Sequence, residues 1–238
     1  MDNGGGIYCI NNSSLIIVNC VVVDNRVSEN GGGIYCGASS PAIINCTISN
    51  NWAGKGSGIY CHLFSAPVLT NTIMWGENPQ VIYFSELGTS NEITVSYSNL
   101  QGGQTGIFTN GNGLVHWGDG NIDVDPIFVD ASVGDYHLGD NNPCFGVGTL
   151  ENMPKTDIEG SFRPNPIGSN PDIGAYEKSS GVPTDVIAPV VMSVSSPSGS
   201  GVYKESDIVV IVVTFSESVI VRGMPPVSYT HQTLPTKA

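Results

Sequence analysis

The chain has 238 residues, of which 40% are hydrophobic and only 12% are charged, and its formal net charge is −13. Few charges combined with 30 glycines argue against a helical bundle and favour short strands joined by tight turns. So acidic a chain is repelled by nucleic-acid phosphates and anionic lipids, and no apolar run is long enough to span a bilayer. The composition therefore excludes nucleic acid and membrane insertion, and it favours sugars, cations or other proteins as partners.

The first eighty residues repeat a short motif. GGGIYC at residues 4–9 recurs at 31–36, and GSGIYC follows at 56–61. Two further columns recur at intervals of 26 residues, namely Cys20, Cys46 and Thr72 in one, and Asn25 and Asn51 in the other.

Each repeat contains short alternating runs separated by Asn, Ser, Gly and Pro, and it contains no helical stretch. Such a unit predicts one coil of a right-handed parallel β-helix, in which successive coils stack at about 4.8 Å. Equivalent residues then form ladders, which explains why the same six residues are written three times. The glycines permit bends where a side chain would not fit.

GGGIYC and INCTIS resemble the repeats of bacterial surface proteins in the pectate-lyase-like β-helix superfamily. The resemblance covers residues 1 to about 80 and implies an exported protein located outside the cell or at the bacterial cell surface. Met1 falls inside the first repeat, so we expect the chain to be a fragment of a longer protein, and a missing signal peptide carries no information.

Residues 81–178 lose the strict period, and we expect irregular coils followed by a cap. NIDVDPIFVD, GDYHL, NNPCFGVG, DIEGSFRP and PDIGAYE resemble, in this order, the closing region of exported β-helix proteins of the choice-of-anchor Q type. The resemblance departs at NNPCFGVG, where the family's acidic residue is absent. It implies that this region covers the open end of the β-helix, which would otherwise expose unpaired strand edges.

The carboxyl-terminal part contains three predicted segments. Residues 179–188 read as a linker, and residues 189–226 resemble the opening strands of a bacterial immunoglobulin-like module. Residues 227–238 resemble a translated sequencing adapter, so we expect them to be non-native. The predicted fold class is therefore all-β, a solenoid of residues 1–178 with a cap, plus a partial β-sandwich.

The cysteines of the repeats occupy ladder columns, with Cys9, Cys36 and Cys61 in one and Cys20 and Cys46 in the other. Disulfides are one interpretation for an exported protein, including a bridge between Cys9 and Cys20 across the core. Stacked side chains point the same way, which disfavours bonding within a column. We favour buried free thiols that act as small apolar rungs.

Tyr8, Tyr35 and Tyr60 alternate with the inward residues of the motif and should form an outward aromatic ladder. One interpretation is a platform on which sugar rings pack, which would make a polysaccharide or a cell-surface glycan the partner. The other is that the rings stack on each other and stiffen the sheet.

An acid-rich stretch resembles a calcium-binding loop. The residues with oxygen ligands are Asp119, Asn121, Asp123, Asp125 and Asp130. An EF-hand loop requires glycine at its sixth position and glutamate at its twelfth, where this stretch has Val124 and Asp130, so the stretch does not match an EF-hand. Calcium held by some of these side chains and a structural turn remain the alternatives, and Asp172 and Glu177 carry the same ambiguity.

Catalysis requires residues that the repeats place poorly. A lyase needs a basic residue beside clustered acids, but Arg26 and Lys55 fall in turns between coils without acids stacked on them. A hydrolase needs paired acids, and Asp2 and Asp24 are not paired by the repeat. We therefore expect a non-catalytic adhesion or display protein. The alternative is a fragment of a polysaccharide lyase or glycoside hydrolase whose catalytic coils are missing.

Overall fold

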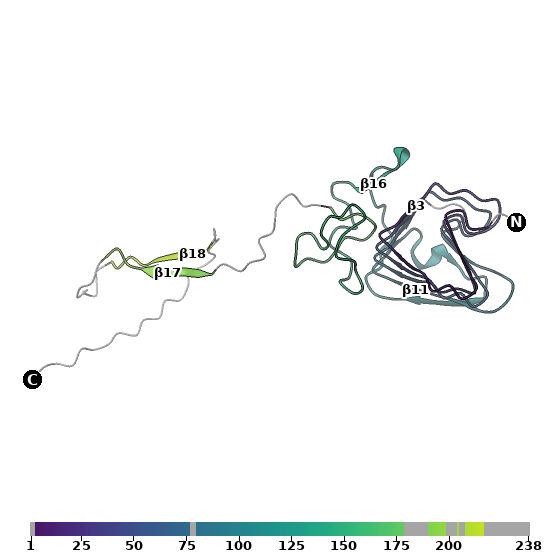
Figure 1. The fold of residues 1–238 in the computed structure, drawn as a ribbon, viewed down its shortest axis with the longest axis horizontal. Helices are drawn as coiled ribbons and strands as arrows, with labels where there is room; N and C mark the ends of the chain where they lie inside the picture. The colour runs from purple at the N-terminus through teal and green to yellow at the C-terminus, as the bar shows by residue number, and fades with distance from the viewer. Residues whose placement is uncertain (1–2, 77–79, 179–189, 199–203, 205–207, 217–238) are drawn as a thin grey trace, which may run out of the picture. The chain divides into compact units, whose positions relative to one another are not determined.

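The computed structural model describes residues 3–76, 80–178, 190–198, 204 and 208–216. The chain divides into two compact units, residues 1–184 and 185–238, and each is considered by itself (Figure 1). The predicted linker at 179–188 and the predicted non-native tail at 227–238 lie outside the described residues.

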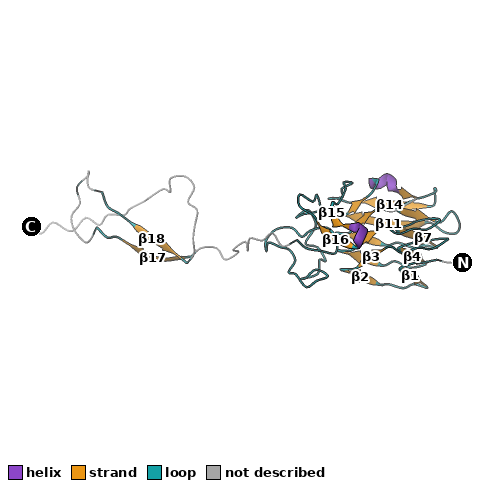
Figure 2. Cartoon of the chain, turned by 90° about the horizontal axis from the view of Figure 1, so that it is seen from above, coloured by secondary structure: helices purple, strands orange, loops and turns teal. Residues whose placement is uncertain are grey.

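The first unit is a parallel β-solenoid with three sheets (Figures 1 and 2). Each full coil contributes one strand to each of the three sheets. The first sheet contains β1 (Ile7–Ile10), β4 (Ile34–Gly37), β7 (Ile59–His62), β10 (Ile82–Phe84) and β13 (Ile107–Phe108). The second contains β2 (Ile16–Val18), β5 (Ala42–Ile44), β8 (Val68–Thr70), β11 (Asn91–Ser96) and β14 (Gly113–Trp117). The third contains β3 (Val21–Val23), β6 (Thr47–Ser49), β9 (Ile73–Trp75) and β12 (Asn99–Leu100).

The register of the sheets confirms the ladders predicted from the repeats. Tyr35 pairs with Tyr8 on one side and Tyr60 on the other, and Cys36 lies between Cys9 and Cys61 in the same way. The all-β class and the parallel stacking of coils are therefore as the sequence predicts.

The core consists of inward-facing columns of aliphatic side chains. Its fully buried members are contributed by all three sheets, so a single apolar interior runs through the coils: Ile34, Ile43, Ile48, Ile59, Leu69, Met74, Ile82, Ile93 and Leu100. Burial of these side chains supplies the main driving force for folding.

The glycines of the repeat are required by the backbone. Gly31 has a φ of 71°, in the left-handed region that glycine adopts without a steric penalty. A Cβ atom on Gly33 would lie 2.8 Å from the carbonyl oxygen of Gly58 in the next coil. The motif therefore repeats its glycines because adjacent coils approach each other closely at this turn.

Bends of the coil are built by one recurring device. At the corner between the second and third sheets, Asn19, Asn45, Asn71 and Tyr97 are all left-handed, with φ between 47° and 51°. The residue that follows each of them donates its backbone N–H to the side chain of its equivalent in the next coil. These bonds are Cys20 N to Cys46 Sγ (3.4 Å), Cys46 N to Thr72 Oγ1 (3.4 Å), Thr72 N to Ser98 Oγ (3.1 Å) and Ser98 N to Asn121 Oδ1 (3.0 Å).

The same device recurs at the other two corners. After the first sheet, the N–H groups of successive rungs donate to hydroxyl or amide oxygens, from Ser13 to Ser39 (3.2 Å), from Ser39 to Ser65 (3.3 Å) and from Ser65 to Asn91 (3.2 Å). After the third sheet, Asn25 N donates to Asn51 Oδ1 (3.0 Å). Each bend interrupts the backbone ladder, and the side chain from the next coil replaces the missing carbonyl acceptor.

The position of the closing region differs from the prediction. Residues 123–178, which we call the flanking segment, lie along the side of the coils and do not cap an end (Figures 1 and 2). Their backbone carbonyls accept hydrogen bonds from asparagine amides of four successive coils, of which the first three occupy equivalent corner positions and the fourth, Asn99, lies two residues after the equivalent Tyr97. These bonds are Asn19 to Thr156 (2.7 Å), Asn45 to Asp172 (3.3 Å), Asn71 to Thr149 (2.8 Å) and Asn99 to Val124 (2.7 Å).

The flanking segment has little regular structure of its own. It contains β15 (Phe128–Asp130), the 3₁₀ turn η2 (Ala131–Val133) and β16 (Asp135–Leu138), and its two strands are antiparallel. A second apolar cluster attaches it to the solenoid through Ile73, Leu138, Cys144 and Ile173. A further 3₁₀ turn, η1 (Gly103–Gly106), belongs to the coils.

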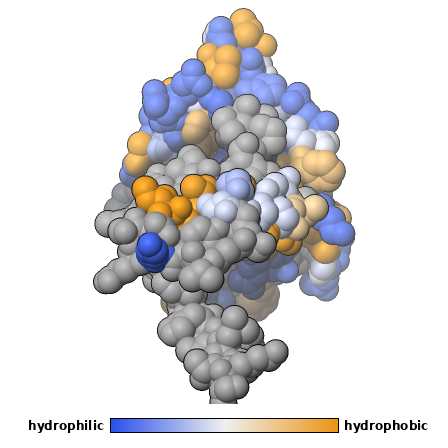
Figure 3. Space-filling model, turned by 90° about the vertical axis from the view of Figure 1, so that its left-hand side faces the viewer, coloured by the Kyte–Doolittle hydropathy of each residue, from blue (hydrophilic) through white to orange (hydrophobic). Residues whose placement is uncertain are grey.

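The described part of the second unit is one antiparallel pair, β17 (Val191–Ser195) and β18 (Val212–Phe215). Its apolar side chains are exposed, which gives this ribbon its orange surface in Figure 3. The immunoglobulin-like module stays a prediction, because a sandwich needs about seven strands.

The corner device predicts a selective loss of stability in Ser98→Ala. The change leaves the buried N–H of Thr72 without an acceptor, which should lower the free energy of unfolding by about 1–3 kcal/mol. Urea denaturation measures this. The matched control is Ser96→Ala two residues earlier, which is half-buried and should change the value by no more than about 0.5 kcal/mol. Equal effects of the two changes would contradict the device.

Candidate functional site

The predicted tyrosine ladder is present and is one rung longer than the sequence indicates. Ring centroids lie 4.8 Å apart for Tyr8 and Tyr35, 5.4 Å for Tyr35 and Tyr60, and 5.9 Å for Tyr60 and Tyr83. Tyr83 escapes sequence analysis because it lies in VIYFS, after the GGGIYC motif has faded.

Of the two interpretations of this ladder, the exposed fractions fit stacking of the rings better than a platform for sugars. Tyr8 is 50% exposed, whereas Tyr35, Tyr60 and Tyr83 are only 9%, 8% and 6% exposed. The rings cover each other's faces, and Ile10 packs against the cluster they form. These tyrosines therefore present little free ring surface to a sugar, and their contacts stiffen the first sheet.

A charged pair borders the tyrosine ladder. Lys55 Nζ lies 3.2 Å from Glu86 Oε1 and 5.2 Å from the centroid of the Tyr83 ring, and the Tyr83 hydroxyl donates to Glu86. Desolvation lowers the pKa of Lys55, but hydrogen bonds to Glu86 and Tyr83 outweigh it and the net pKa is raised. Lys55 is therefore a protonated cation near neutral pH and is poorly suited to act as a base.

Four of the five predicted oxygen ligands for calcium make side-chain hydrogen bonds at turns and corners. Asn121 belongs to a corner, where its Oδ1 accepts from Ser98 and its Nδ2 donates to the carbonyl of Val95 (2.8 Å). Three aspartates accept backbone N–H groups of turns through Oδ1. These are Asp123 from Gly102 (2.9 Å), Asp125 from Ile127 (2.9 Å) and Asp130 from Ser132 (3.1 Å).

The structure therefore favours the structural-turn interpretation of this stretch. Within the described residues, no group of three or more His, Cys, Asp or Glu side chains is arranged to hold a metal ion. Asp119, the first of the predicted ligands, instead contributes its backbone carbonyl, which accepts from Tyr97 N (2.8 Å).

A buried ionic cluster lies inside the flanking segment. Arg163 Nη1 is 3.3 Å from Glu177 Oε2 and donates to the carbonyl of Asp172 (2.9 Å), and the side chains of Arg163 and Glu177 are fully buried. Glu177 also accepts from the backbone N–H groups of Asn165 (2.7 Å) and Asp172 (3.1 Å). The sequence left Glu177 open between a calcium ligand and a structural residue, and these contacts make it structural.

Two further carboxylates complete the cluster. Asp172 accepts from the backbone N–H groups of Gly146 (2.7 Å) and Lys178 (2.8 Å), and Asp157 accepts from that of Glu177 (2.9 Å). The backbone beside them reaches the solenoid, where Ala175 N donates to Thr47 Oγ1 (3.1 Å). The spacing of Asp157 and Arg163 in DIEGSFR was the available signal for this cluster.

Three carboxylates and one guanidinium share this desolvated space, which shifts their proton equilibria. Burial, with the neighbouring charge of Asp172, raises the pKa of Glu177 to about 7. Burial also raises the pKa of Asp172 and lowers that of Arg163. The cluster therefore favours protonation of one of its carboxyl groups in mildly acidic solution.

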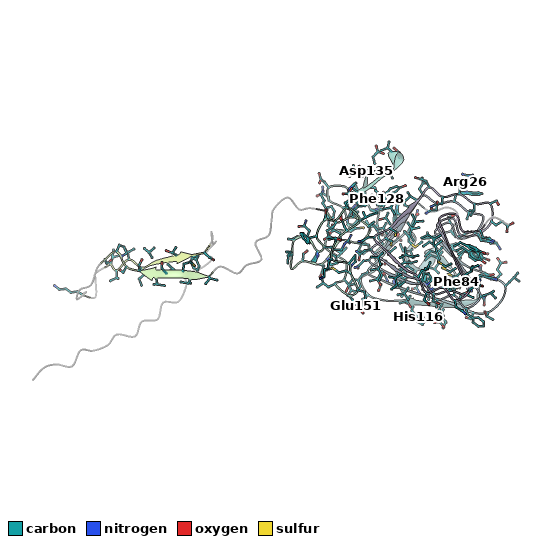
Figure 4. The ribbon with its side chains drawn as sticks, in the orientation of Figure 1. Arg26, Phe84, His116, Phe128, Asp135 and Glu151 are labelled. Carbon is teal, nitrogen blue, oxygen red and sulfur yellow. The ribbon has the colours of Figure 1, made fainter. Side chains whose placement is uncertain are left out.

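His137 forms a second ionic group in the flanking segment. Its Nδ1 is 2.6 Å from Asp135 Oδ1, its Nε2 is 3.1 Å from Glu159 Oε2, and its ring centroid is 4.1 Å from that of Tyr176. Desolvation lowers the pKa of His137, but the two carboxylates outweigh it and the net pKa is raised. This group joins β16 to the turn that contains Glu159, and Figure 4 shows Asp135 at the projecting edge of the segment.

All six cysteines are free, and of the five in the ladder columns, for which buried free thiols were the favoured interpretation, all but the half-buried Cys20 are buried. A hydrogen bond with Cys36 and burial raise the pKa of Cys9, and burial raises that of Cys144 to about 12. These thiols stay protonated at neutral pH and are poor nucleophiles. A side-chain hydrogen bond with Cys46 lowers the pKa of the half-buried Cys20 to about 6.

Comparison with known proteins gives one match. The sequence profile described as "Right handed beta helix region" matches residues 1–134. No curated protein sequence and no solved structure matches the chain. In the part of the chain that the structure describes, no helix is both long and apolar enough to cross a membrane.

The ionic cluster predicts how stability depends on pH. The pKa of Glu177 is about 7 in the folded state and 4.5 for an unperturbed carboxyl, so between these values the folded state binds more protons than the unfolded state. The contribution of Glu177 is therefore fully present below about pH 4.5, falls as the pH rises, and levels off above pH 7. The free energy of unfolding, measured by urea denaturation from pH 4.5 to 8, should show this fall relative to Glu177→Gln.

The size of the effect is bounded by about 1.4 kcal/mol for each unit of pKa shift. Glu151→Gln is the matched control, because Glu151 is an exposed acid of the same segment and should leave the pH profile unchanged. A difference between the wild type and Glu177→Gln that is constant or rises with pH would mean that Glu177 is ionised throughout in the folded protein.

Proposed function

Because the chain belongs to the right-handed β-helix family, we propose that it is a non-catalytic adhesion or display element of an exported bacterial protein, secreted or held at the cell surface. Its partner on this proposal is a polysaccharide or a cell-surface glycan. The observation that carries the non-catalytic role is the closed tyrosine stack on the outer face of the first sheet, and the glycan partner is proposed from the resemblance of the repeats.

A β-helix that cleaves a polymer along its first sheet needs an open floor for the chain and a basic group beside it. Here Tyr35, Tyr60 and Tyr83 fill that floor with their own rings. Lys55, the cation beside them, is held protonated by Glu86 and Tyr83. These two features favour a structural role for this face over catalysis.

The solenoid is well suited to hold exposed groups at fixed positions. Backbone and side-chain hydrogen bonds connect each coil to the next at all three corners, so the outward side chains repeat at regular intervals. A rigid scaffold reduces the entropy lost when such side chains bind a partner.

Export is proposed from the resemblance of the repeats and of the flanking segment to exported β-helix proteins. The choice-of-anchor Q assignment of the flanking segment and the immunoglobulin-like assignment of residues 189–226 belong to this proposal. Burial and raised pKa values would protect Cys9 and Cys36 from reaction in an oxidising compartment, whereas the half-buried Cys20, with its lowered pKa, lacks this protection.

The proposal is tested by two measurements on the same polysaccharides, namely whether the chain cleaves them and whether it binds them. The full chain is incubated with pectin, alginate and xylan, with calcium added, and assayed for new reducing ends and for unsaturated products. We expect neither, together with retarded migration of the chain in native gels that contain one of these or a neutral polysaccharide. Turnover would instead support the alternative, a piece of a lyase or hydrolase, and the absence of any retardation would reject the glycan partner.

A further inference from the structure

A polar groove lies at the corner that follows β3 and β6. Its volume is about 410 Å³, in the range of small-ligand sites. It is lined by residues at equivalent positions of successive coils: Asp24, Asn25, Arg26, Asn50, Asn51, Trp52 and Gly76.

The groove exists because one ladder of the solenoid is interrupted. Asp24, Asn50 and Gly76 are equivalent corner residues, and all three are left-handed, with φ of 57°, 56° and 76°. The first two rungs carry polar side chains and the third carries none. At this rung the groove is therefore lined by the backbone of Gly76, whose N–H donates to Gln101 Oε1 (2.9 Å).

One wall of the groove is an arginine stacked on a tryptophan. The guanidinium carbon of Arg26 lies 4.3 Å from the Trp52 ring centroid, and Trp52 is 38% exposed. No carboxylate of the described residues forms an ion pair with Arg26. Stacking fixes the plane of the guanidinium, whose five N–H groups can donate to a ligand. Figure 4 shows Arg26 at the periphery of the coil.

The other wall supplies acceptors. The Asn50 amide donates to Asp24 Oδ1, which leaves Asp24 Oδ2 and Asn50 Oδ1 as acceptors at the surface. The neighbouring Asn25 and Asn51 are engaged inward, since Asn25 donates to Asn51 Oδ1 and Asn51 donates to the carbonyl of Val22 (2.8 Å). The outward side chains are thus the ones that can meet a ligand.

The chemistry of the groove selects a particular class of ligand. Formal charges of Asp24 and Arg26 cancel, so an anion or a cation gains little net attraction. Donors and acceptors lie side by side, an arrangement that matches adjacent hydroxyl groups, each of which both donates and accepts. The indole of Trp52 adds an apolar surface for C–H groups.

We propose that this groove binds a neutral sugar ring, with Arg26 and Asp24 hydrogen-bonded to its hydroxyls and Trp52 against its apolar edge. The inference rests on the proposed glycan partner and places the contact away from the tyrosine ladder, which the sugar-platform interpretation of the sequence had used. The cavity of about 280 Å³ in the flanking segment is a weaker candidate for a sugar site. Its cation, Lys178, is already paired with Asp140 and lies 4.9 Å from the Phe145 ring centroid.

The experiment is an NMR titration of the full ¹⁵N-labelled chain. The probes are the methyl glycosides of glucose, galactose, mannose and N-acetylglucosamine, with galacturonate as the anionic comparison. With at least one neutral glycoside, the indole N–H of Trp52 and the Nε–H of Arg26 should shift and saturate, with a Kd of about 1 mM. The indole signals of Trp75 and Trp117 should not move. No saturable shift at Trp52 with any neutral glycoside would overturn the proposal.

Variants locate the contact. Trp52→Ala and Arg26→Ala should each weaken binding by about tenfold or more, whereas Phe64→Ala, at an exposed aromatic residue of a different corner, should not. Dispersed amide spectra confirm that each variant is folded. Unchanged affinity in Trp52→Ala would overturn the proposal.

Asp24→Asn tests the claim that charge balance selects a neutral ligand. Asparagine tolerates the left-handed backbone at this position, and the change leaves Arg26 as the only charge in the groove. Galacturonate should then bind more tightly than to the wild type, while the neutral glycoside changes little. A preference for galacturonate in the wild type would overturn the proposed ligand class.

Failure of the groove and failure of the proposed function give different results. Polymer retention that persists in Trp52→Ala, without a Trp52 shift in the wild type, would reject the groove and keep the glycan partner. Polymer turnover together with saturable binding at Trp52 would reject the non-catalytic role and keep the groove.

Discussion

The hydrogen bond from a corner amide to a short polar side chain in the next coil is the constraint on which the solenoid depends. A bend removes one N–H from the backbone ladder, and leaving such a group buried without an acceptor costs about 1–3 kcal/mol. Only a side chain at the same position of the next coil can reach it, so each corner must recur in register. Cys20, Cys46, Thr72 and Ser98 meet this requirement at intervals of 26 residues, and Asn121 meets it after 23.

The corner device also determines where the flanking segment lies. A left-handed residue precedes each inward corner residue, and at the second corner this residue is asparagine in three successive coils. Asparagine tolerates the left-handed backbone and directs its amide outward. A column of amides on the flank needs carbonyl acceptors, which residues 123–178 provide. The buried cluster around Arg163 then holds together a segment that has almost no regular structure of its own.

Local periodicity made the coils predictable, whereas contacts between distant segments were not. Strand register, the free thiols and the stacking of tyrosines all follow from equivalent positions in neighbouring repeats. Ser13, Ser39 and Ser65 also recur every 26 residues, but among other turn formers this signal is indistinct. The sequence predicts a cap at the end of the coils, whereas the flanking segment lies along their side. The contacts that hold it there join residues far apart in the sequence, such as Asn19 and Thr156, which are 137 residues apart, and no local pattern indicates them. Alternation correctly placed Tyr35 and Tyr60 on the outer face, but it contains no information about how closely stacked rings bury each other.

Regular stacking leaves few positions free to acquire a function. Inward residues are fixed by the core, corner residues by the hydrogen-bond columns, and the outer face of the first sheet by its tyrosines. Variation is tolerated at outward positions next to the corners, where a change disturbs no neighbouring coil. One polar hollow lies there beside an interrupted ladder, where Gly76 follows Asp24 and Asn50. On the proposal made for this groove, the interruption of a repeat, and not the repeat itself, marks the binding site of this solenoid.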